Sequence, residues 1–242
     1  GVRLQSTAYN NYIYSNRITA NDGSSGLILL SATVYNNYIY ENNITKIGGA
    51  TATNLALSST VYNNKIYSNI IVTASQFGEA ITLQTNVYNN SIYSNIIRHT
   101  SFDAAGIYLN SNVYNNFVYE NNITTTNLRT HGIFLDTDVY NNSVYRNNVT
   151  TISIGSRGIY LNSNVYNNSI YENNIQTNGS SSEGVYLAST VYRNSVYWNN
   201  INTSSSNSSG IHLENSAYNN TIYNNNITTQ NVNGSHGIYL NI

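Results

Sequence analysis

Five aliphatic positions recur in each unit of this chain, and their spacing changes part-way through the unit. In the unit that begins at Gly106 they are Ile107, Leu109, Val113, Val118 and Ile123. The first two lie two residues apart, as on one face of a β-strand, whereas the later gaps of five are odd and require the chain to turn. An α-helical face would need apolar residues at a spacing of about 3.6, and the many β-branched and tyrosine residues also favour strands. The unit therefore predicts three short strands, at about 107–109, 113–119 and 121–125.

The unit is repeated nine times along the chain. Its first tyrosine falls at Tyr9, Tyr35, Tyr62, Tyr88, Tyr114, Tyr140, Tyr166, Tyr192 and Tyr218. The step between neighbours is 26 residues, except for one step of 27, and a fixed period of this length is typical of a solenoid. Strands in the same register in every unit predict an all-β fold, a right-handed parallel β-helix of about nine 26-residue coils with three short strands each. We expect residues 1–242 to form a single β-solenoid domain of nine repeats plus the first strand of a tenth.

Asparagine fills two positions of every coil. The first set is Asn11, Asn37, Asn64, Asn90, Asn116, Asn142, Asn168, Asn194 and Asn220. The second set is Asn16, Asn42, Asn69, Asn95, Asn121, Asn147, Asn173, Asn199 and Asn225. Each stands two residues before an inward aliphatic residue, so strand parity points it inward at a corner, where its amide must be hydrogen-bonded. We expect stacked amides that bond one another along the axis.

Tyrosine is equally ordered. A second tyrosine follows five residues after the first, at Tyr14, Tyr40, Tyr67, Tyr93, Tyr119, Tyr145, Tyr171, Tyr197 and Tyr223. Each of these 18 tyrosines directly follows an inward residue, so parity predicts two outward tyrosine ladders on the surface. Two interpretations stay open here: the rings stack only for stability, or they also form an apolar strip that contacts sugar or another rod.

The composition limits the partners and the means of stabilisation. Charged residues make up 8% of the chain and the net charge is −1, which argues against nucleic acid and anionic lipid because both need a basic patch. No apolar run is long enough for membrane insertion as a helix. The chain has no Cys, Met or Pro, so disulfides and Cys-ligated metals are excluded. We find no signal peptide, and we expect no cofactor and no metal site.

Two acidic residues are the closest carboxylate pair in the chain. Asp136 and Asp138 could bind Ca²⁺ or act as acid and base, but we expect Asp136 to point outward and Asp138 to be a turn residue. The histidines are spread over distant coils and form no metal set; they are His99, His131, His212 and His236. We therefore assign no catalytic residue, and the sequence favours a non-enzymatic role over an enzymatic one without deciding between them.

Three charged residues hold one outward position in consecutive coils. They are Glu120, Arg146 and Glu172, and we expect an exposed ion-pair ladder that contributes about 1 kcal/mol or less per pair.

Sequons for N-glycosylation are frequent, and glycans would offset the low charge of the surface. Those at outward strand positions are Asn122, Asn148 and Asn226, and those expected in accessible loops are Asn178, Asn202, Asn207 and Asn233.

The repeat resembles that of the right-handed β-helix proteins of the pectin-lyase-like superfamily, which includes NosD-like proteins. The resemblance rests on Gly106-Ile107-x-Leu109 followed by Asn115-Asn116-x-Val118-x-x-Asn121-x-Ile123. It implies the fold but not one function, since the superfamily includes pectate lyases, polygalacturonases, mannuronan epimerases, tailspikes and adhesins. A hydrolase-like site would need acidic residues on adjacent coils, whereas asparagines flank Asp136 and Asp138 one coil away.

The chain begins and stops on the first strand of a coil, without a capping helix or a charged terminal coil. Open solenoid ends recruit other strands, so caps would lie outside this sequence or coils of different copies would stack. We expect a structural, extracellular or cell-surface β-solenoid, a subunit or segment of a filament, sheath or adhesin stalk that assembles with itself end to end. The alternative is a β-helix module that binds or cleaves polysaccharide.

Overall fold

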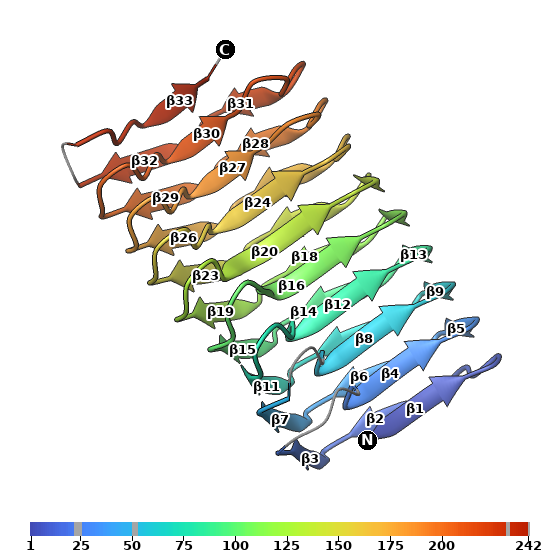
Figure 1. Cartoon of the computed structure of the whole chain (residues 1–242). Coiled ribbons are helices and arrows are strands. Elements are labelled where there is room, and N and C mark those ends of the chain that lie inside the picture. The colour runs from blue at the N-terminus through green and yellow to red at the C-terminus, as the bar shows by residue number, and fades with distance from the viewer. Residues whose placement is uncertain (22–25, 50–52, 231–232, 242) are drawn as a thin grey trace.

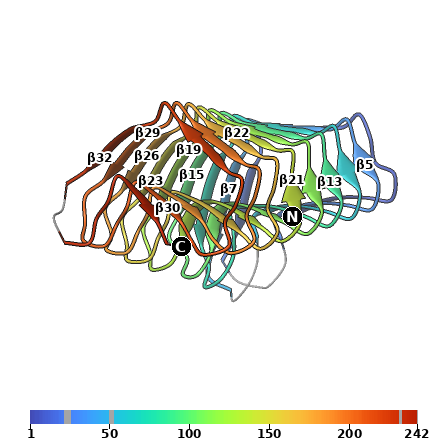
Figure 2. The same cartoon turned by 90° about the horizontal axis from the view of Figure 1, so that it is seen from above.

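The chain is a parallel β-helix (Figure 1). The computed structural model describes residues 1–21, 26–49, 53–230 and 233–241. Figure 2 shows the coils nested one behind another, from the N-terminal coil in blue to the C-terminal coil in red. No helix within these residues is long and apolar enough to cross a membrane. The all-β solenoid predicted from the 26-residue period is confirmed.

Three long sheets run the length of the described chain, and every neighbouring pair of strands in them is parallel. Sheet 1 contains β1 (Val2–Gln5), β4 (Ile28–Ser31), β8 (Leu55–Ser58), β12 (Ile81–Gln84), β16 (Ala105–Asn110), β20 (His131–Asp136), β24 (Ile159–Asn162), β27 (Val185–Leu187), β30 (Ile211–Leu213) and β33 (Ile238–Leu240). Sheet 2 contains β2 (Tyr12–Tyr14), β6 (Tyr38–Tyr40), β10 (Lys65–Tyr67), β14 (Ser91–Tyr93), β18 (Phe117–Tyr119), β22 (Ser143–Tyr145), β25 (Ser169–Tyr171), β28 (Ser195–Tyr197) and β31 (Thr221–Tyr223). Sheet 3 contains β3 (Arg17–Ala20), β7 (Asn43–Ile47), β11 (Ile70–Ala74), β15 (Ile96–His99), β19 (Asn122–Thr125), β23 (Asn148–Thr151), β26 (Asn174–Thr177), β29 (Asn200–Thr203) and β32 (Asn226–Thr229).

A fourth, short sheet was not predicted. It contains β5 (Val34–Tyr35), β9 (Val61–Tyr62), β13 (Val87–Tyr88), β17 (Val113–Tyr114) and β21 (Val139–Tyr140). The predicted strand 113–119 is therefore wrong: the chain breaks after Tyr114. Asn115 adopts a left-handed backbone with φ of 55°, a conformation that asparagine tolerates better than most residues. This corner is what restores Val118 to the inward face.

The core is the inside of the coil, and the predicted aliphatic positions fill it. Ile107, Leu109, Val113, Val118 and Ile123 are all fully buried. Each sits beside its counterpart one coil away, as in the register Ile107↔Ile133 and Leu109↔Leu135.

Both predicted asparagine columns lie inside the corners and form hydrogen-bonded ladders. In the middle of the first column, Oδ1 of Asn116 accepts bonds from the backbone nitrogen and Nδ2 of Asn90, at 2.9 and 3.1 Å. Its Nδ2 lies 2.9 Å from the carbonyl oxygens of Val87 and Tyr114. The second column repeats this pattern, as between Asn121 and Asn147. The amides thus satisfy the backbone groups that a tight corner leaves without ladder partners.

Both tyrosine ladders are present on the outside of the coil. In the first tyrosine ladder, Tyr9 to Tyr218, successive ring centroids are 5.0–5.1 Å apart with interplanar angles of 3–8°. In the second tyrosine ladder, Tyr14 to Tyr223, the spacing is 4.8–5.0 Å and the angles are 3–7°. Rings at the ends are exposed, whereas rings inside each ladder are half-buried because their neighbours cover both faces.

Candidate functional site

The outer face of sheet 1 carries a third aromatic column, which we call the aromatic strip. It consists of Tyr108, Phe134, Tyr160, Tyr186, His212 and Tyr239, paired in register along the sheet. Several of its rings are turned relative to one another: the interplanar angle is 32° between Tyr108 and Phe134 and 71° between Tyr186 and His212. Phe134 and Tyr160, in contrast, stack face to face with their centroids 4.5 Å apart. Unlike the tyrosine ladders, the aromatic strip therefore does not cover all of its own ring faces.

Polar columns flank the aromatic strip on both sides. One column stands at or just before the start of individual strands of sheet 1 and consists of Glu79, His131, Arg157, Glu183 and His236. Two residues beyond the strip on the same strands stand Asn110, Asp136, Asn162 and Glu214. The face is thus apolar in the middle and rich in hydrogen-bonding groups at both margins, which is the composition of a ligand-binding surface.

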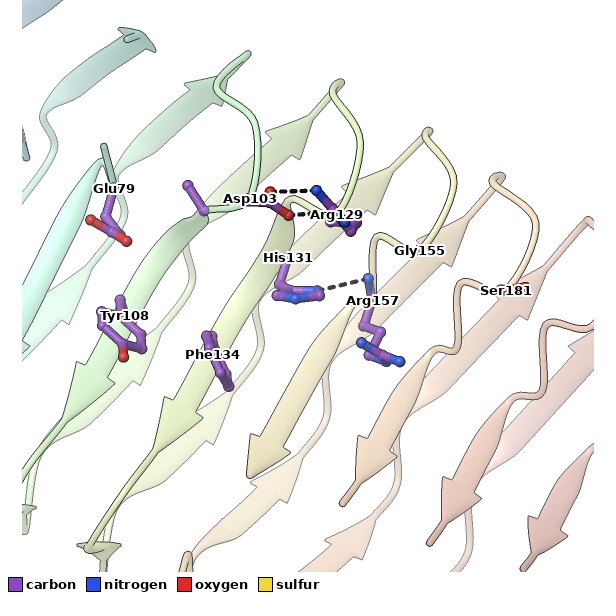
Figure 3. Close-up of a pocket in the computed structure, with 10 residues that line it drawn as sticks. Glu79, Asp103, Tyr108, Arg129, His131, Phe134, Gly155, Arg157 and Ser181 are labelled. Atoms are coloured by element: carbon purple, nitrogen blue, oxygen red, sulfur yellow. Dashed lines mark hydrogen bonds and ion pairs between the residues drawn. The ribbon is translucent and has the colours of Figure 1, made fainter. Parts of the chain in front are cut away.

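A pocket of about 420 Å³ opens at the N-terminal end of the aromatic strip (Figure 3). Tyr108 and Phe134 line it from sheet 1. The segments that lead into sheet 1 supply its charged and polar members, which are Glu79, Asp103, Arg129, His131, Arg157 and Ser181. Residues from several successive coils therefore meet at one concave place.

His131 is a neutral hydrogen-bond donor in this pocket. Its ring is buried, and Nδ1 accepts a hydrogen bond from the backbone nitrogen of Arg157 at 3.1 Å. Burial and the nearby positive charge of Arg157 lower the pKa of His131 to about 3. A neutral imidazole that accepts at Nδ1 carries its proton on Nε2. His131 is therefore suited to holding a ligand oxygen rather than to acting as an acid.

Two further groups of the site have pKa values raised by burial. Burial, together with the hydrogen bond to Asp136, raises the pKa of Tyr108, whose hydroxyl donates to Oδ2 of Asp136 at 3.2 Å. Burial likewise raises the pKa of Glu79. Asp136 accepts a second hydrogen bond from Nδ2 of Asn162 at 3.0 Å. Tyr108 therefore remains a phenol at neutral pH and does not act as a base.

The arginines of the pocket are paired. Nη2 of Arg129 lies 2.6 Å from Oδ2 of Asp103, at the exposed rim. Nε of Arg157 lies 3.0 Å from Oε2 of the buried Glu183. The guanidinium of Arg157 also stacks on the aromatic strip, 4.7 Å from the ring centre of Tyr160 and 4.1 Å from that of Tyr186. The ion pair with Glu183 fixes the plane of the Arg157 guanidinium, which thereby stays packed on the rings of Tyr160 and Tyr186.

The C-terminal part of the aromatic strip holds two of the histidines near one another. His212 lies between two carboxylates, with Nδ1 3.7 Å from Glu183 and Nε2 3.9 Å from Glu214. Its ring contacts that of Tyr239, which also stacks with His236. The interpretation that all four histidines lie far apart is thus wrong for His212 and His236, which belong to adjacent coils. Within the described chain, no group of three His, Cys, Asp or Glu side chains could hold a metal ion.

The two candidate aspartates have separate structural partners. Asp136 binds Tyr108 and Asn162, whereas the exposed Asp138 sits in a left-handed turn with φ of 58° and accepts a hydrogen bond from Asn164. The turn position predicted for Asp138 is confirmed.

The predicted ion-pair ladder is formed in one of its two steps. Nε of Arg146 lies 2.7 Å from Oε2 of Glu172. The hydrogen bond with Glu172 is the main reason why the pKa of Arg146 is raised. Glu120 adds only a longer-range electrostatic attraction.

The structure places the sequons in three environments. Asn122, Asn148 and Asn226 are exposed on sheet 3, but the side-chain nitrogens of Asn148 and Asn226 donate hydrogen bonds to Asn122 and Asn200. Asn178, Asn207 and Asn233 lie in loops as predicted. Asn202 does not: it lies inside β29, and its Oδ1 is buried without a hydrogen-bond partner.

Sequence reasoning missed the aromatic strip, although a signal for it exists. An aromatic residue stands two positions after each later coil-opening glycine, as in Gly106-Ile107-Tyr108 and Gly132-Ile133-Phe134. The column mixes Tyr, Phe and His, and the early coils have Leu29, Ala56 and Thr82 in its place. A search for one residue type therefore overlooks it.

Comparison with known proteins gives a fold likeness only. No family model matches the chain, and no curated protein is similar to it in sequence. Among solved structures, the chain is similar to the A-module of the mannuronan C-5 epimerase AlgE6 from Azotobacter vinelandii, with a TM-score of 0.49 and 13% identity over 99% of this chain and 83% of the other. A match at this level carries no argument about activity, and the superfamily suggested by the repeat stays a hypothesis.

Proposed function

We propose that this β-helix binds a polysaccharide chain along the outer face of sheet 1. The observation that carries the proposal is the aromatic strip, which runs across successive coils between two polar columns and passes through the pocket at Tyr108 and Phe134. Sugar rings present apolar C–H faces and polar edges, so a polymer of them fits a row of aromatic rings bordered by hydrogen-bonding groups. An extracellular or cell-surface location follows from this proposal and is part of it.

The tyrosine ladders are poorer platforms for sugar than the aromatic strip. Their rings stack face to face within 4.8–5.1 Å, so each internal ring offers the solvent only its edge and hydroxyl. A sugar that stacks on an aromatic residue needs a free ring face. We therefore assign sugar binding to sheet 1 and a stabilising role to the ladders.

The groups in the pocket favour binding over turnover. His131 is neutral, Tyr108 is a phenol that is bonded to Asp136, and both arginines are already paired. None of these is a free base poised near neutral pH, which general base catalysis requires. The proposed module holds its polymer without cleaving it.

Affinity electrophoresis and calorimetry with pectin, alginate and a neutral glucan test the proposal. Phe134→Ala should weaken binding of the retained polymer about tenfold or more, equal to about 1.4 kcal/mol. Tyr140→Ala, which removes a ring of similar size from the first tyrosine ladder, is the matched control and should leave binding unchanged. Equal losses in both variants, or no retention by any polymer, would contradict the proposal. Product formation that disappears in Asp136→Asn would replace binding by catalysis.

End-to-end assembly is a second proposal. Its support is the equivalence of the coils: neighbouring strands keep one register from coil to coil, as in Tyr67↔Tyr93 and Tyr119↔Tyr145. Coils of two copies would pair in the same way. Electron microscopy of the purified chain tests it, with long unbranched fibres expected and discrete monomers as the contrary result.

A further inference from the structure

The second tyrosine ladder is an unbroken column of stacked phenols with one tryptophan attached to it. All eight steps from Tyr14 to Tyr223 have ring centroids 4.8–5.0 Å apart and nearly parallel planes. Stacked rings at this distance overlap through their π-systems. Identical neighbours also have nearly equal oxidation potentials, so the column offers a path for an unpaired electron along the rod.

Trp198 is the single tryptophan of the chain, and it stands at the side of this column. Its ring centroid lies 5.3 Å from that of Tyr197, at an interplanar angle of 72°. The side chain is 54% exposed, because a left-handed corner with φ of 54° holds the residue outside the coil. In the neighbouring coils this corner carries Glu172 and Asn224, neither of which is easily oxidised.

The rest of the composition leaves most of the readily oxidised groups in the two ladders, which hold 18 of the 24 tyrosines. The chain has no Cys and no Met, the side chains that most readily intercept one-electron oxidation elsewhere. An indole loses an electron readily to an oxidant in solution, and a tryptophyl radical can in turn oxidise a neighbouring phenol. Trp198 and Tyr197 are placed in that order, from solvent to ladder.

We propose that the second tyrosine ladder is a one-electron relay, in which an unpaired electron moves from tyrosine to tyrosine along the rod. Trp198 is its entry point, because it gives the first electron to an oxidant in solution, such as a metal complex in its oxidised state. The oxidant gains one electron from the indole of Trp198, and the indole gives its N–H proton to water and becomes a neutral radical. Tyr197 then gives an electron to Trp198 and its phenolic proton to water, while the indole regains a proton from water. Tyr171 next reduces the Tyr197 radical by the same exchange, and the unpaired electron moves on coil by coil.

The protonation of the ladder is consistent with this sequence of steps. Burial, with the neighbouring Tyr93 and Tyr145, raises the pKa of Tyr119 to about 12, and the pKa values of Tyr93 and Tyr145 are raised in the same direction. The ladder residues are thus phenols, and each transfer moves a proton as well as an electron. The rings are half-buried rather than enclosed, so water reaches the column to take up and return these protons.

A photo-oxidant attached to one position tests the relay. Because the chain has no cysteine, Asn224→Cys gives a unique attachment point for a ruthenium polypyridyl complex at the corner one coil beyond Trp198. After a flash with an electron-accepting quencher, a nitroso spin trap marks the radical sites, and mass spectrometry of peptides locates the adducts. We expect adducts to extend from Tyr197 to the tyrosines between Tyr14 and Tyr93.

Paired variants distinguish the relay from random oxidation. Tyr119→Phe with Tyr145→Phe keeps the rings stacked but removes two hydroxyls, and adducts between Tyr14 and Tyr93 should be lost while those at Tyr171 and Tyr197 remain. Tyr114→Phe with Tyr140→Phe makes the same change in the first tyrosine ladder and should leave the pattern unchanged. With the same complex free in solution instead of attached, Trp198→Phe should lower the yield of adducts on Tyr197 and Tyr171. Two results would overturn the proposal: adducts confined to Tyr197 and Tyr171 in the parent protein, or an unchanged adduct pattern in the variant with Tyr119→Phe and Tyr145→Phe. Circular dichroism checks that each variant is folded.

Discussion

Nδ2 of Asn116 donates a hydrogen bond to Oδ1 of Asn142, one coil further along the chain, at 3.1 Å. The backbone nitrogen of Asn116 donates to the same oxygen at 2.9 Å. One amide thus serves the corners of two coils, and the column of such amides joins all nine coils at the same point. Stability is shared between neighbours in this arrangement, as expected for a repeat protein.

Loss of one amide from the middle of this column should therefore be costly. Asn116→Ala leaves the donors of Asn90 and the carbonyl oxygens of Val87 and Tyr114 without their partner. At about 1–3 kcal/mol per buried unsatisfied group, we expect a loss of about 3 kcal/mol or more, measured by urea unfolding. Asn122→Ala on the exposed face of sheet 3 is the control and should cost about 0.5 kcal/mol or less. Equal losses of unfolding free energy in the two variants would show that the buried asparagine column contributes no more to stability than an exposed asparagine.

The glycine that opens a coil should not tolerate a side chain where the next coil lies close. A Cβ at Gly158 would lie 2.5 Å from the carbonyl oxygen of Gly184 and would clash with Cγ2 of Ile175. A Cβ at Gly237 would have no neighbour within 4 Å. Gly158→Ala should therefore lower the free energy of unfolding by about 1–3 kcal/mol, while Gly237→Ala leaves it nearly unchanged. A thermal melt of both variants checks this, and a stable Gly158→Ala protein would contradict the packing.

One left-handed corner carries an unfavourable residue that can be corrected. Arg193 has φ of 56°, whereas the same corner of the coils before and after it holds Asn167 and Asn219 with φ of 56° and 55°. Since asparagine tolerates this conformation better, Arg193→Asn should raise the unfolding free energy by about 1 kcal/mol. Arg98→Asn, on the exposed face of strand β15, loses the same charge without a left-handed backbone and should give no gain. Equal effects of the two changes would mean that charge, not conformation, is responsible.

His99 should make the fold sensitive to acid. Burial lowers its pKa from 6.5 to about 4, although the hydrogen bond between Nε2 and the carbonyl oxygen of Gly78 opposes the shift. Between these values the unfolded chain binds a proton that the folded chain does not. Stability therefore falls as the pH drops from 6.5 to about 4, by about 1.4 kcal/mol per pH unit for this residue.

His99→Thr provides the test, because Thr73 and Thr125 occupy the same position in the coils on either side. Urea unfolding between pH 4 and 7.5 should show a shallower pH dependence for the variant by about one proton. His131, with its pKa lowered to about 3 by burial, contributes to the slope that remains. Identical slopes in the two proteins would contradict the assignment.

The coil could be read from the sequence because each part of it depends on local rules repeated nine times. The spacing of Ile107, Leu109, Val118 and Ile123 alone predicts that they point inward. The asparagines are then predicted to point inward as well, because each stands two residues before such a position. The break at Asn115 was harder to place, because a left-handed residue has no signature beyond its identity.

The candidate site depends on relations that parity does not reveal. Glu79, Arg129 and Phe134 meet only because segments from successive coils project to one place, and their distances depend on loop shape. The stacking of Arg157 on Tyr160 and Tyr186 likewise requires a particular side-chain rotamer. The sequence could indicate the column of aromatic residues but not the angles that leave ring faces free.

The unchanging register between coils has a consequence for how such a gene can vary. Val118 pairs with Ile92 on one side and Val144 on the other, and both partners are aliphatic. A duplicated segment of one period would therefore form an extra coil between two existing coils and would make the same contacts with each of them. Unequal recombination could lengthen or shorten the molecule in whole steps, and natural variants of this protein would then differ in reach while every surviving contact stayed the same.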